Sequence, residues 1–243
     1  MMHTVSCVYF YLLVQCIQRK LYIMQGGHLF MKTEKHFYTA ICQLIVFTFW
    51  TILVYFVDIQ PIGPQGSKVG FAAFNRYVHE LTGVHFFLYD ITDWLGLVPI
   101  GIAAGFALLG LTQWIQRRKL LRVDRDLLLL GCFYIVVIAA FLFFEIFVIN
   151  YRPVLIEGKL EASYPSSTTM LALCVMPTAI HQISIRIKNR QWKMLILNAL
   201  HIFTVFMVIG RLISGVHWAT DIIGGILLSA GLVKLYLAAN QHI

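Results

Sequence analysis

The sequence has 243 residues, of which 59% are hydrophobic and only 12% are charged, with a formal net charge of +8. Soluble domains carry about 25% charged residues, so this composition excludes a soluble protein and predicts an integral membrane protein. The basic residues fall in short connections between apolar segments, which indicates membrane topology and gives no reason to expect a nucleic-acid partner.

Six segments are long and apolar enough to cross a hydrocarbon layer of about 30 Å. These segments cover residues 38–57, 92–115, 127–149, 166–184, 194–211 and 218–238. Residues 58–90 begin with proline and glycine residues and predict a loop, followed by a short interfacial helix within 71–89. The predicted fold class is therefore all-α: a polytopic membrane bundle of six transmembrane helices.

The first thirty residues do not fit this pattern. The apolar stretch 5–17 is shorter than the roughly 20 residues that a spanning helix needs. Met31, in contrast, stands directly before the first span, as at the start of a bacterial inner-membrane protein. We therefore hypothesise that residues 1–30 are a mis-called start or a disordered extension, and that residues 31–243 form one six-span domain.

The distribution of basic residues predicts the orientation of the bundle. Loops 116–126 and 185–193 together contain nine of the 19 lysine and arginine residues, and Lys32 and Lys35 precede the first span. All three regions are expected on the same side of the membrane, which is predicted to be the cytoplasm, with both termini there. The remaining loops, and the polar residues that they carry, are then expected at the outer face of the inner membrane.

The segment Gly210–Asp221 concentrates polar chemistry beside two predicted spans. Arg211 offers a planar guanidinium group that is suited to phosphate oxygens. Asp221 follows His217 by four residues, so on a helix the two would share a face. A carboxylate that accepts a hydrogen bond from one imidazole nitrogen fixes the tautomer and leaves the other nitrogen free to attack. Arg211, His217 and Asp221 are therefore the candidate catalytic residues.

Two further segments are predicted at the same face. Arg152 ends the third predicted span together with Pro153. The hydroxyl residues Ser166, Ser167 and Thr168 stand where the fourth helix is predicted to begin, and a helix N-terminus attracts anions. Each feature alone is usually structural, as a helix cap or a solvated side chain. Together they predict a phosphate-binding pocket beside a histidine nucleophile.

These residues resemble the motifs of the type-2 phosphatidic acid phosphatase superfamily, which includes bacterial lipid phosphate phosphatases and is related to vanadium haloperoxidases. Arg152-Pro153 is similar to the end of its first motif. Pro165-Ser166-Ser167-Thr168 stands at the place of its Pro-Ser-Gly-His motif. Gly210-Arg211-x5-His217-x3-Asp221 is similar to its third motif except for the leading serine. The resemblance extends over residues 36–238.

The resemblance implies a hydrolase of membrane lipid phosphates or polyprenyl diphosphates such as undecaprenyl diphosphate, acting without a metal or another cofactor. It implies that His217 attacks phosphorus to form a phosphohistidine, that Asp221 orients His217, and that water then releases phosphate. The phosphate-binding residues that it implies, beside Arg211, are Arg152, Ser166, Ser167 and Thr168. The expected partners are the lipid substrate and the bilayer, and no oligomeric state follows from the sequence.

The sequence departs from the family pattern at two positions. Glu145 stands where the family has a phosphate-binding lysine, and Thr168 stands where it has a second histidine that protonates the leaving group. Loss of a general acid typically slows a reaction by about 10²–10⁴-fold. A phosphate leaving group needs this proton less than an alkoxide does, so we expect a preference for lipid diphosphates over monoesters. The candidate substitute acids are Glu145, Glu157, Glu161, His79 and His85.

Two other functions are alternatives. A catalytically weak or inactive relative that binds lipid phosphates would account for the absent lysine and second histidine. Binding alone, however, does not need an oriented nucleophile. A small transporter would be expected to contain broken helices or paired repeats at the midplane, and the sequence shows neither pattern. A lipid phosphatase is therefore the leading prediction.

Overall fold

The computed structural model describes residues 29–241, with side chains from Phe37 onward. The chain divides into two units, Met1–Lys35 and His36–Ile243, and every contact described below lies within the second unit. The hypothesis about residues 1–30 concerns a segment that lies, up to residue 28, outside the described residues.

The described chain is helical, with isolated β-bridges in place of strands. Its α-helices are α2 (Leu29–Phe56), α3 (Ala72–Thr82), α4 (Phe86–Leu95), α5 (Leu97–Arg117), α6 (Arg125–Ile146), α7 (Ser167–Arg186), α8 (Arg190–Ile213) and α9 (Ala219–Asn240). Two short 3₁₀ helices are η1 (Pro64–Gly66) and η2 (Leu120–Arg122). Six segments are long and apolar enough to cross a membrane: Phe37–Phe56, Phe86–Arg117, Arg125–Ile146, Ser167–Arg186, Arg190–Ile213 and Ala219–Asn240. The predicted all-α fold class with six spans is confirmed.

The second span begins earlier than the sequence predicted. α4 and α5 join at Gly96 into one apolar segment, Phe86–Arg117. Gly96 has helical dihedral angles (φ −59°, ψ −19°), and its N–H donates to carbonyl groups of the preceding turn, so the helical path continues. The short helix expected within 71–89 is present as α3. It ends at Gly83, whose positive φ (68°) a glycine adopts without strain.

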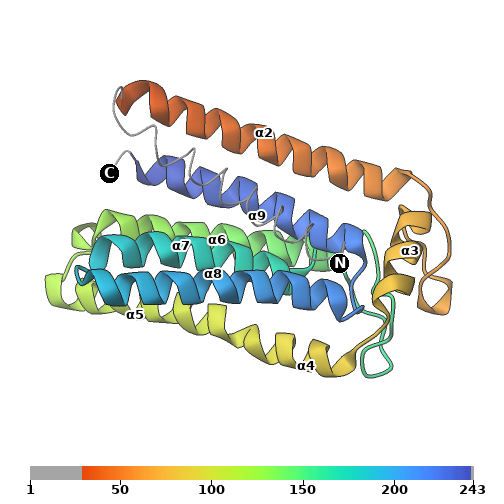
Figure 1. The fold of residues 1–243 in the computed structure, drawn as a ribbon. Helices are drawn as coiled ribbons and strands as arrows, with labels where there is room; N and C mark the ends of the chain where they lie inside the picture. Colours follow the sequence, from red (N-terminus) through yellow and green to blue (C-terminus); the bar gives the residue numbers. More distant parts are fainter. Residues whose placement is uncertain (1–28, 242–243) are drawn as a thin grey trace. The chain divides into compact units, whose positions relative to one another are not determined.

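The helices α7 and α9 form the centre of the bundle. They pack against each other and against α6 and α8, and Figure 1 shows these four helices side by side. Many apolar side chains on α2, α5, α6 and α8 are exposed, as expected for helices that face lipid. The first turn of α9 is buried and that of α7 is partly buried, with Thr169 and Thr220 fully covered. The central position of these two helices therefore brings their N-termini into the interior at one end of the bundle.

Candidate active site

Connections that are distant in the sequence are tied together at the end of the bundle where α7 and α9 begin. Between the α8–α9 and α6–α7 connections, Trp218 Nε1 donates to the carbonyl oxygen of Tyr151 at 2.8 Å. Between α3 and α9, Asn75 Nδ2 donates to Thr220 Oγ1 at 2.9 Å, and Asn75 Oδ1 accepts the Thr220 N–H at 3.2 Å. These bonds fix the relative positions of the loops that carry the candidate site residues.

The connection between α6 and α7 folds as a short hairpin. The Arg152 N–H donates to the carbonyl oxygen of Glu161 at 3.0 Å, and the Ser163 N–H donates to that of Asn150 at 2.9 Å. The turn residues Glu157-Gly158 both have positive φ (49° and 74°), as the commonest two-residue hairpin turns require. The hairpin therefore holds Arg152 and Ser163 on its two opposite arms.

The guanidinium groups of Arg152 and Arg211 converge on one nitrogen of His217. Arg152 Nη1 lies 3.4 Å and Arg211 Nη2 lies 3.3 Å from His217 Nε2. All three side chains are buried, and Arg211 is 0% exposed. A guanidinium group has no acceptor, so Nε2 must accept in both contacts and carries no proton. The imidazole thus presents the Nε2 lone pair towards two cations.

The other ring nitrogen of His217 contacts Ser163. Ser163 Oγ lies 2.9 Å from Nδ1 and donates its own proton to Asp221 Oδ2 at 2.5 Å. Asp221 also accepts from Asn150 Nδ2 at 3.1 Å and from the Trp218 N–H at 3.0 Å. The Asp221 carboxylate is therefore linked to the imidazole through a serine hydroxyl.

His217 lies before α9, whereas a continuous helix would place it on the same face as Asp221. The helix begins at Ala219, and its N-cap residue Trp218 has extended dihedral angles (φ −71°, ψ 152°). Asp221 stands in the first turn, where a carboxylate is favoured by the helix dipole. Because the backbone turns between the two residues, Ser163 occupies the space that separates their side chains.

The two arginines are only partly neutralised by their neighbours. Their guanidinium carbons lie over the ring of Tyr89, at 5.9 Å for Arg152 and 4.9 Å for Arg211 from its centroid. Arg152 Nε lies 3.1 Å from a carboxylate oxygen of Glu161, and Arg211 Nη1 lies 3.5 Å from one of Asp93. The Asp93 side chain is 56% exposed, so water screens its charge. Within the described residues, the buried Nε of Arg211 has no hydrogen-bond partner.

The predicted hydroxyl residues stand at the start of α7. Ser166 is the N-cap; its N–H donates to the carbonyl oxygen of Asp221 at 3.1 Å, and its hydroxyl donates to the hydroxyl of Thr169 at 3.0 Å. Ser166 is fully buried, so its hydroxyl is engaged within the helix end. Ser167 and Thr168 are half-buried. The first N–H groups of an α-helix have no acceptor inside the helix, so this end offers donors to an anion.

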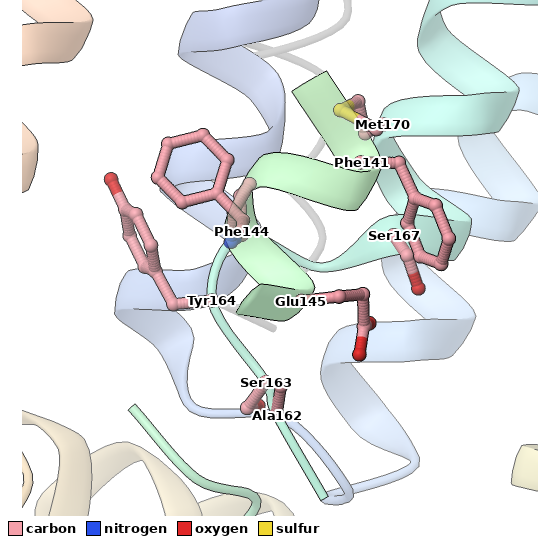
Figure 2. Close-up of a pocket in the computed structure, with 9 residues that line it drawn as sticks. Phe141, Phe144, Glu145, Ala162, Ser163, Tyr164, Ser167 and Met170 are labelled. Atoms are coloured by element: carbon pink, nitrogen blue, oxygen red, sulfur yellow. The ribbon is translucent and has the colours of Figure 1, made fainter. Parts of the chain in front are cut away.

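A shallow pocket borders this region on the side of α6 (Figure 2). It is lined by Phe141, Phe144, Glu145, Ala162, Ser163, Tyr164, Pro165, Ser167 and Met170. Figure 2 shows the Glu145 side chain at the end of α6, near Ser167 and the hairpin. Glu145 is exposed, and within the described residues it takes part in neither a hydrogen bond nor an ion pair. Its carboxylate therefore forms no ion pair with either of the two arginines.

The other candidate substitute acids lie in different surroundings. Glu161 pairs with Arg152, whereas Glu157 is in the hairpin turn. His85 Nε2 contacts the carbonyl oxygen of Thr82 at the end of α3 at 2.9 Å, and the ring of His79 packs against that of Trp218. Glu161 is thus the candidate that contacts one of the two site arginines.

The surroundings of His217 favour its neutral form. Burial, followed by the charges of Arg152 and Arg211, holds the pKa of His217 well below its ordinary value. A neutral imidazole agrees with the unprotonated Nε2 that the hydrogen-bond partners require. In the described part of the chain, no group of three or more His, Cys, Asp or Glu side chains could hold a metal ion.

Four residues of this site were not identified from the sequence. Ser163 and Asn150 lie at the ends of the hairpin arms. The hairpin could have been indicated by Gly158, a glycine between two extended segments. Tyr89 and Asp93 come from α4, which packs against α8. That contact is tertiary, so no local pattern in the sequence could have indicated it.

The fold and the site define a class: a multi-pass membrane helical bundle with two arginines, a neutral histidine and a buried carboxylate at one end. The sequence model of the PAP2 superfamily matches residues 147–242, which contain the hairpin and the helices α7 to α9. The predicted resemblance to this superfamily is therefore confirmed for the segment 147–242.

The comparison with solved structures supports the same fold over most of the chain. A Bacillus subtilis protein described as the first transmembrane PAP2-type phosphatidylglycerolphosphate phosphatase matches with a TM-score of 0.54 and 17% sequence identity. The match covers 84% of this chain and 95% of the other. No curated protein sequence matches the chain.

Proposed function

We propose that this protein is a membrane lipid phosphate or diphosphate phosphatase that acts at the outer face of the cytoplasmic membrane. The observation that carries the proposal is the convergence of Arg152 and Arg211 on His217 Nε2, at 3.4 and 3.3 Å. Two buried like charges around one lone pair are costly unless an anion joins them. A phosphoryl group has oxygens for both guanidinium groups and an electrophilic phosphorus for the histidine.

The proposed reaction has two displacements. In the first, His217 Nε2 bonds to phosphorus while the bond from phosphorus to the leaving oxygen breaks, which gives a phosphohistidine. Arg152, Arg211 and the N–H groups at the start of α7 stabilise the charge that develops on the non-bridging oxygens. In the second, water attacks phosphorus, inorganic phosphate leaves, and Nε2 regains its lone pair. Nδ1 keeps its proton throughout.

The leaving group decides which lipids are hydrolysed well. Thr168 has no proton with a useful pKa, and an alkoxide that leaves a phosphate monoester must take a proton from water instead. A phosphate monoester that leaves a diphosphate needs this proton much less. We therefore expect undecaprenyl diphosphate to react faster than phosphatidic acid. Phosphatidylglycerolphosphate, the substrate named for the structural neighbour, also tests this preference because its terminal phosphate is a monoester.

The proposed outward orientation is supported by the basic residues at the opposite end of the bundle. The connections α5–α6 and α7–α8 and their flanks carry Arg117, Arg118, Lys119, Arg122, Arg125, Arg186, Lys188, Arg190 and Lys193. Such clusters favour the cytoplasmic side. In a variant without native cysteines, Lys159→Cys should react with a membrane-impermeant maleimide in intact cells, and Lys188→Cys should react only after permeabilisation. The reverse pattern would contradict the orientation.

The activity is tested by phosphate release from purified protein in detergent with EDTA present. Undecaprenyl diphosphate and phosphatidic acid are compared, with His217→Ala as the inactive variant. The matched control is His201→Ala, because His201 is an exposed histidine on α8. Release by wild type and His201→Ala that disappears in His217→Ala supports the proposal. Release that needs a divalent metal, or that persists in His217→Ala, contradicts it.

A second function is favoured by two of the site's features. Thr168 cannot replace the family's second histidine as an acid, and Glu145 replaces its phosphate-binding lysine. A weak or inactive relative that binds lipid phosphates would keep the arginines and lose turnover. Saturable binding of a lipid diphosphate without phosphate release by any variant would favour this second function.

A further inference from the structure

We infer that Ser163 is a positioning residue, whose hydroxyl joins Asp221 to His217 and holds the imidazole in the tautomer that leaves Nε2 unprotonated. The inference rests on the proposed function, because it names what prepares the nucleophile of that reaction. Ser163 does not touch the reacting atoms, and it acts through the ring of His217.

The hydrogen-bond partners assign the direction of each bond. The hydroxyl of Ser163 has one proton, and it is donated to Asp221 Oδ2 at 2.5 Å, because a carboxylate can only accept. Ser163 Oγ must therefore accept in its 2.9 Å contact with His217 Nδ1, so Nδ1 carries a proton. On the other side of the ring, the arginines contact Nε2 at the longer distances of 3.4 and 3.3 Å, which agree with an unprotonated nitrogen. Both sets of partners thus fit the same tautomer, and the shorter contact with Ser163 is the one that holds the proton on Nδ1.

The surroundings leave the Ser163 hydroxyl little freedom to turn away. The residue is 2% exposed, and its N–H is bonded to the Asn150 carbonyl oxygen. Asp221 is held by further donors from Asn150 and Trp218, at 3.1 and 3.0 Å. A carboxylate that is fixed in this way keeps its oxygen in place for Ser163. The chain from Nδ1–H through Oγ–H to Oδ2 is therefore preorganised before substrate arrives.

The consequence appears when phosphorus is attacked. Bond formation at Nε2 makes the ring of His217 positively charged, and the chain through Ser163 allows the Asp221 carboxylate to stabilise this charge without direct contact. No proton has to leave Nδ1 in this step. Without the hydroxyl, the Nδ1–H would be buried without an acceptor, and the ring could turn or adopt the tautomer with a proton on Nε2. That tautomer cannot attack phosphorus.

The first test compares turnover in three variants. Ser163→Ala should lower kcat by about 10²–10⁴-fold, as expected for loss of tautomer control, with a small change in KM. Ser163→Thr keeps a hydroxyl and should restore part of kcat. The matched control is Ser229→Ala, because Ser229 is a buried serine on α9 whose hydroxyl donates to a carbonyl oxygen at 3.3 Å. It should keep the wild-type rate.

The effect of Asp221→Asn on kcat, measured with and without the Ser163 hydroxyl, gives a second readout. A purely structural role of Ser163 would not change this effect. If Ser163 transmits the effect of Asp221, then Asp221→Asn should slow the wild type strongly and the Ser163→Ala variant only slightly. Independent, multiplicative effects of the two substitutions on kcat would overturn the inference.

The tautomer itself is measured by nitrogen NMR of protein with ¹⁵N-labelled histidine, with His217→Ala used to assign the signals. We expect a protonated Nδ1 and an unprotonated Nε2 in the wild type and in Ser163→Thr, and loss of this single tautomer in Ser163→Ala. A proton on Nε2 of the wild type, or an unchanged tautomer in Ser163→Ala, would overturn the inference. The measurement needs no turnover, so its outcome is separate from failure of the proposed function.

Discussion

Tyr89 lies under the guanidinium group of Arg211, whose central carbon is 4.9 Å from the ring centroid, in a place where Arg211 is 0% exposed. The same ring lies 5.9 Å from the guanidinium carbon of Arg152. The face of an aromatic ring attracts cations, and the attraction is larger where water is excluded. Tyr89 therefore helps to hold two like charges close together, although it contacts neither His217 nor Asp221 in a hydrogen bond.

Replacement of Tyr89 tests the role of its ring. Tyr89→Leu should lower kcat/KM for a lipid diphosphate by about 10-fold, which corresponds to a cation–π contribution of about 1.4 kcal/mol. Tyr89→Phe keeps the ring face and should remain near the wild-type value. Equal losses in both variants would assign the effect to the hydroxyl group instead.

An inorganic anion should stabilise the folded protein through the two arginines. Orthovanadate or phosphate at about 100 times its dissociation constant would add about 2.7 kcal/mol to the free energy of unfolding. The increase in Tm should disappear in Arg152→Met and Arg211→Met, whereas a surface variant such as Lys159→Met should keep it. Thermal unfolding in detergent, with and without the anion, measures this effect. An unchanged increase in the arginine variants would place the anion elsewhere.

The lowered pKa of His217 predicts how stability depends on pH. An unfolded histidine has a pKa of about 6.5, and the folded value lies well below it. The unfolded chain therefore binds more protons below about pH 6.5, so the free energy of unfolding falls as the pH decreases through this range. A free histidine titrates between about pH 6.5 and about pH 5. Over this range, the decrease in Tm should be smaller for His217→Asn than for the wild type or for His201→Asn, the control at an exposed position.

Restoration of an acid at position 168 should change the substrate preference. Thr168 is half-buried at the start of α7, and its methyl group lies 3.6 Å from the position that a Cβ on Gly96 would take. Thr168→His should raise the turnover of phosphatidic acid by about 10²-fold, the lower limit for general acid catalysis. The turnover of undecaprenyl diphosphate should change less. An equal change for both lipids would contradict the leaving-group argument.

The turn between α8 and α9 should tolerate no side chain at Gly215. Its φ is 68°, and a Cβ there would overlap the carbonyl oxygen of Gly83 in the loop before α4. Gly215→Ala therefore combines backbone strain with a steric clash and should lower both Tm and activity. Gly101→Ala is the matched control, because the position is helical and open. It should leave Tm unchanged or slightly higher.

Much of the fold was predictable, because each span is specified by a continuous apolar run. The six predicted spans agree with the observed helices, and the largest difference is at Phe86–Arg117. There the polar residues Asp90, Thr92 and Asp93 interrupt the apolar run, although helical geometry continues through them. Local hydrophobicity therefore identified most of this segment, Asp93 included, and missed its first turns, which contain Tyr89.

The candidate site was only partly predictable for a different reason. Arg152, Arg211, His217 and Asp221 could be proposed because their spacing carries chemical meaning, and the structure brings them together. Ser163 could not be assigned a role, because its position between His217 and Asp221 depends on a hairpin and on the turn before α9. The hairpin itself is local, but its contact with the turn before α9 joins segments more than 50 residues apart, as in the Ser163–His217 hydrogen bond with a separation of 54.

The position of Asp221 on the last of the six spans bears on how the protein is synthesised. Its carboxylate connects groups from the hairpin to the start of α9, so the earlier spans enter the membrane before this connection exists. A nascent chain with five inserted spans has both arginines but lacks His217 and Asp221. In the proposed mechanism such a chain lacks the nucleophile. The position of His217 just before the last span would then delay hydrolysis of the surrounding lipids until insertion of the bundle is complete.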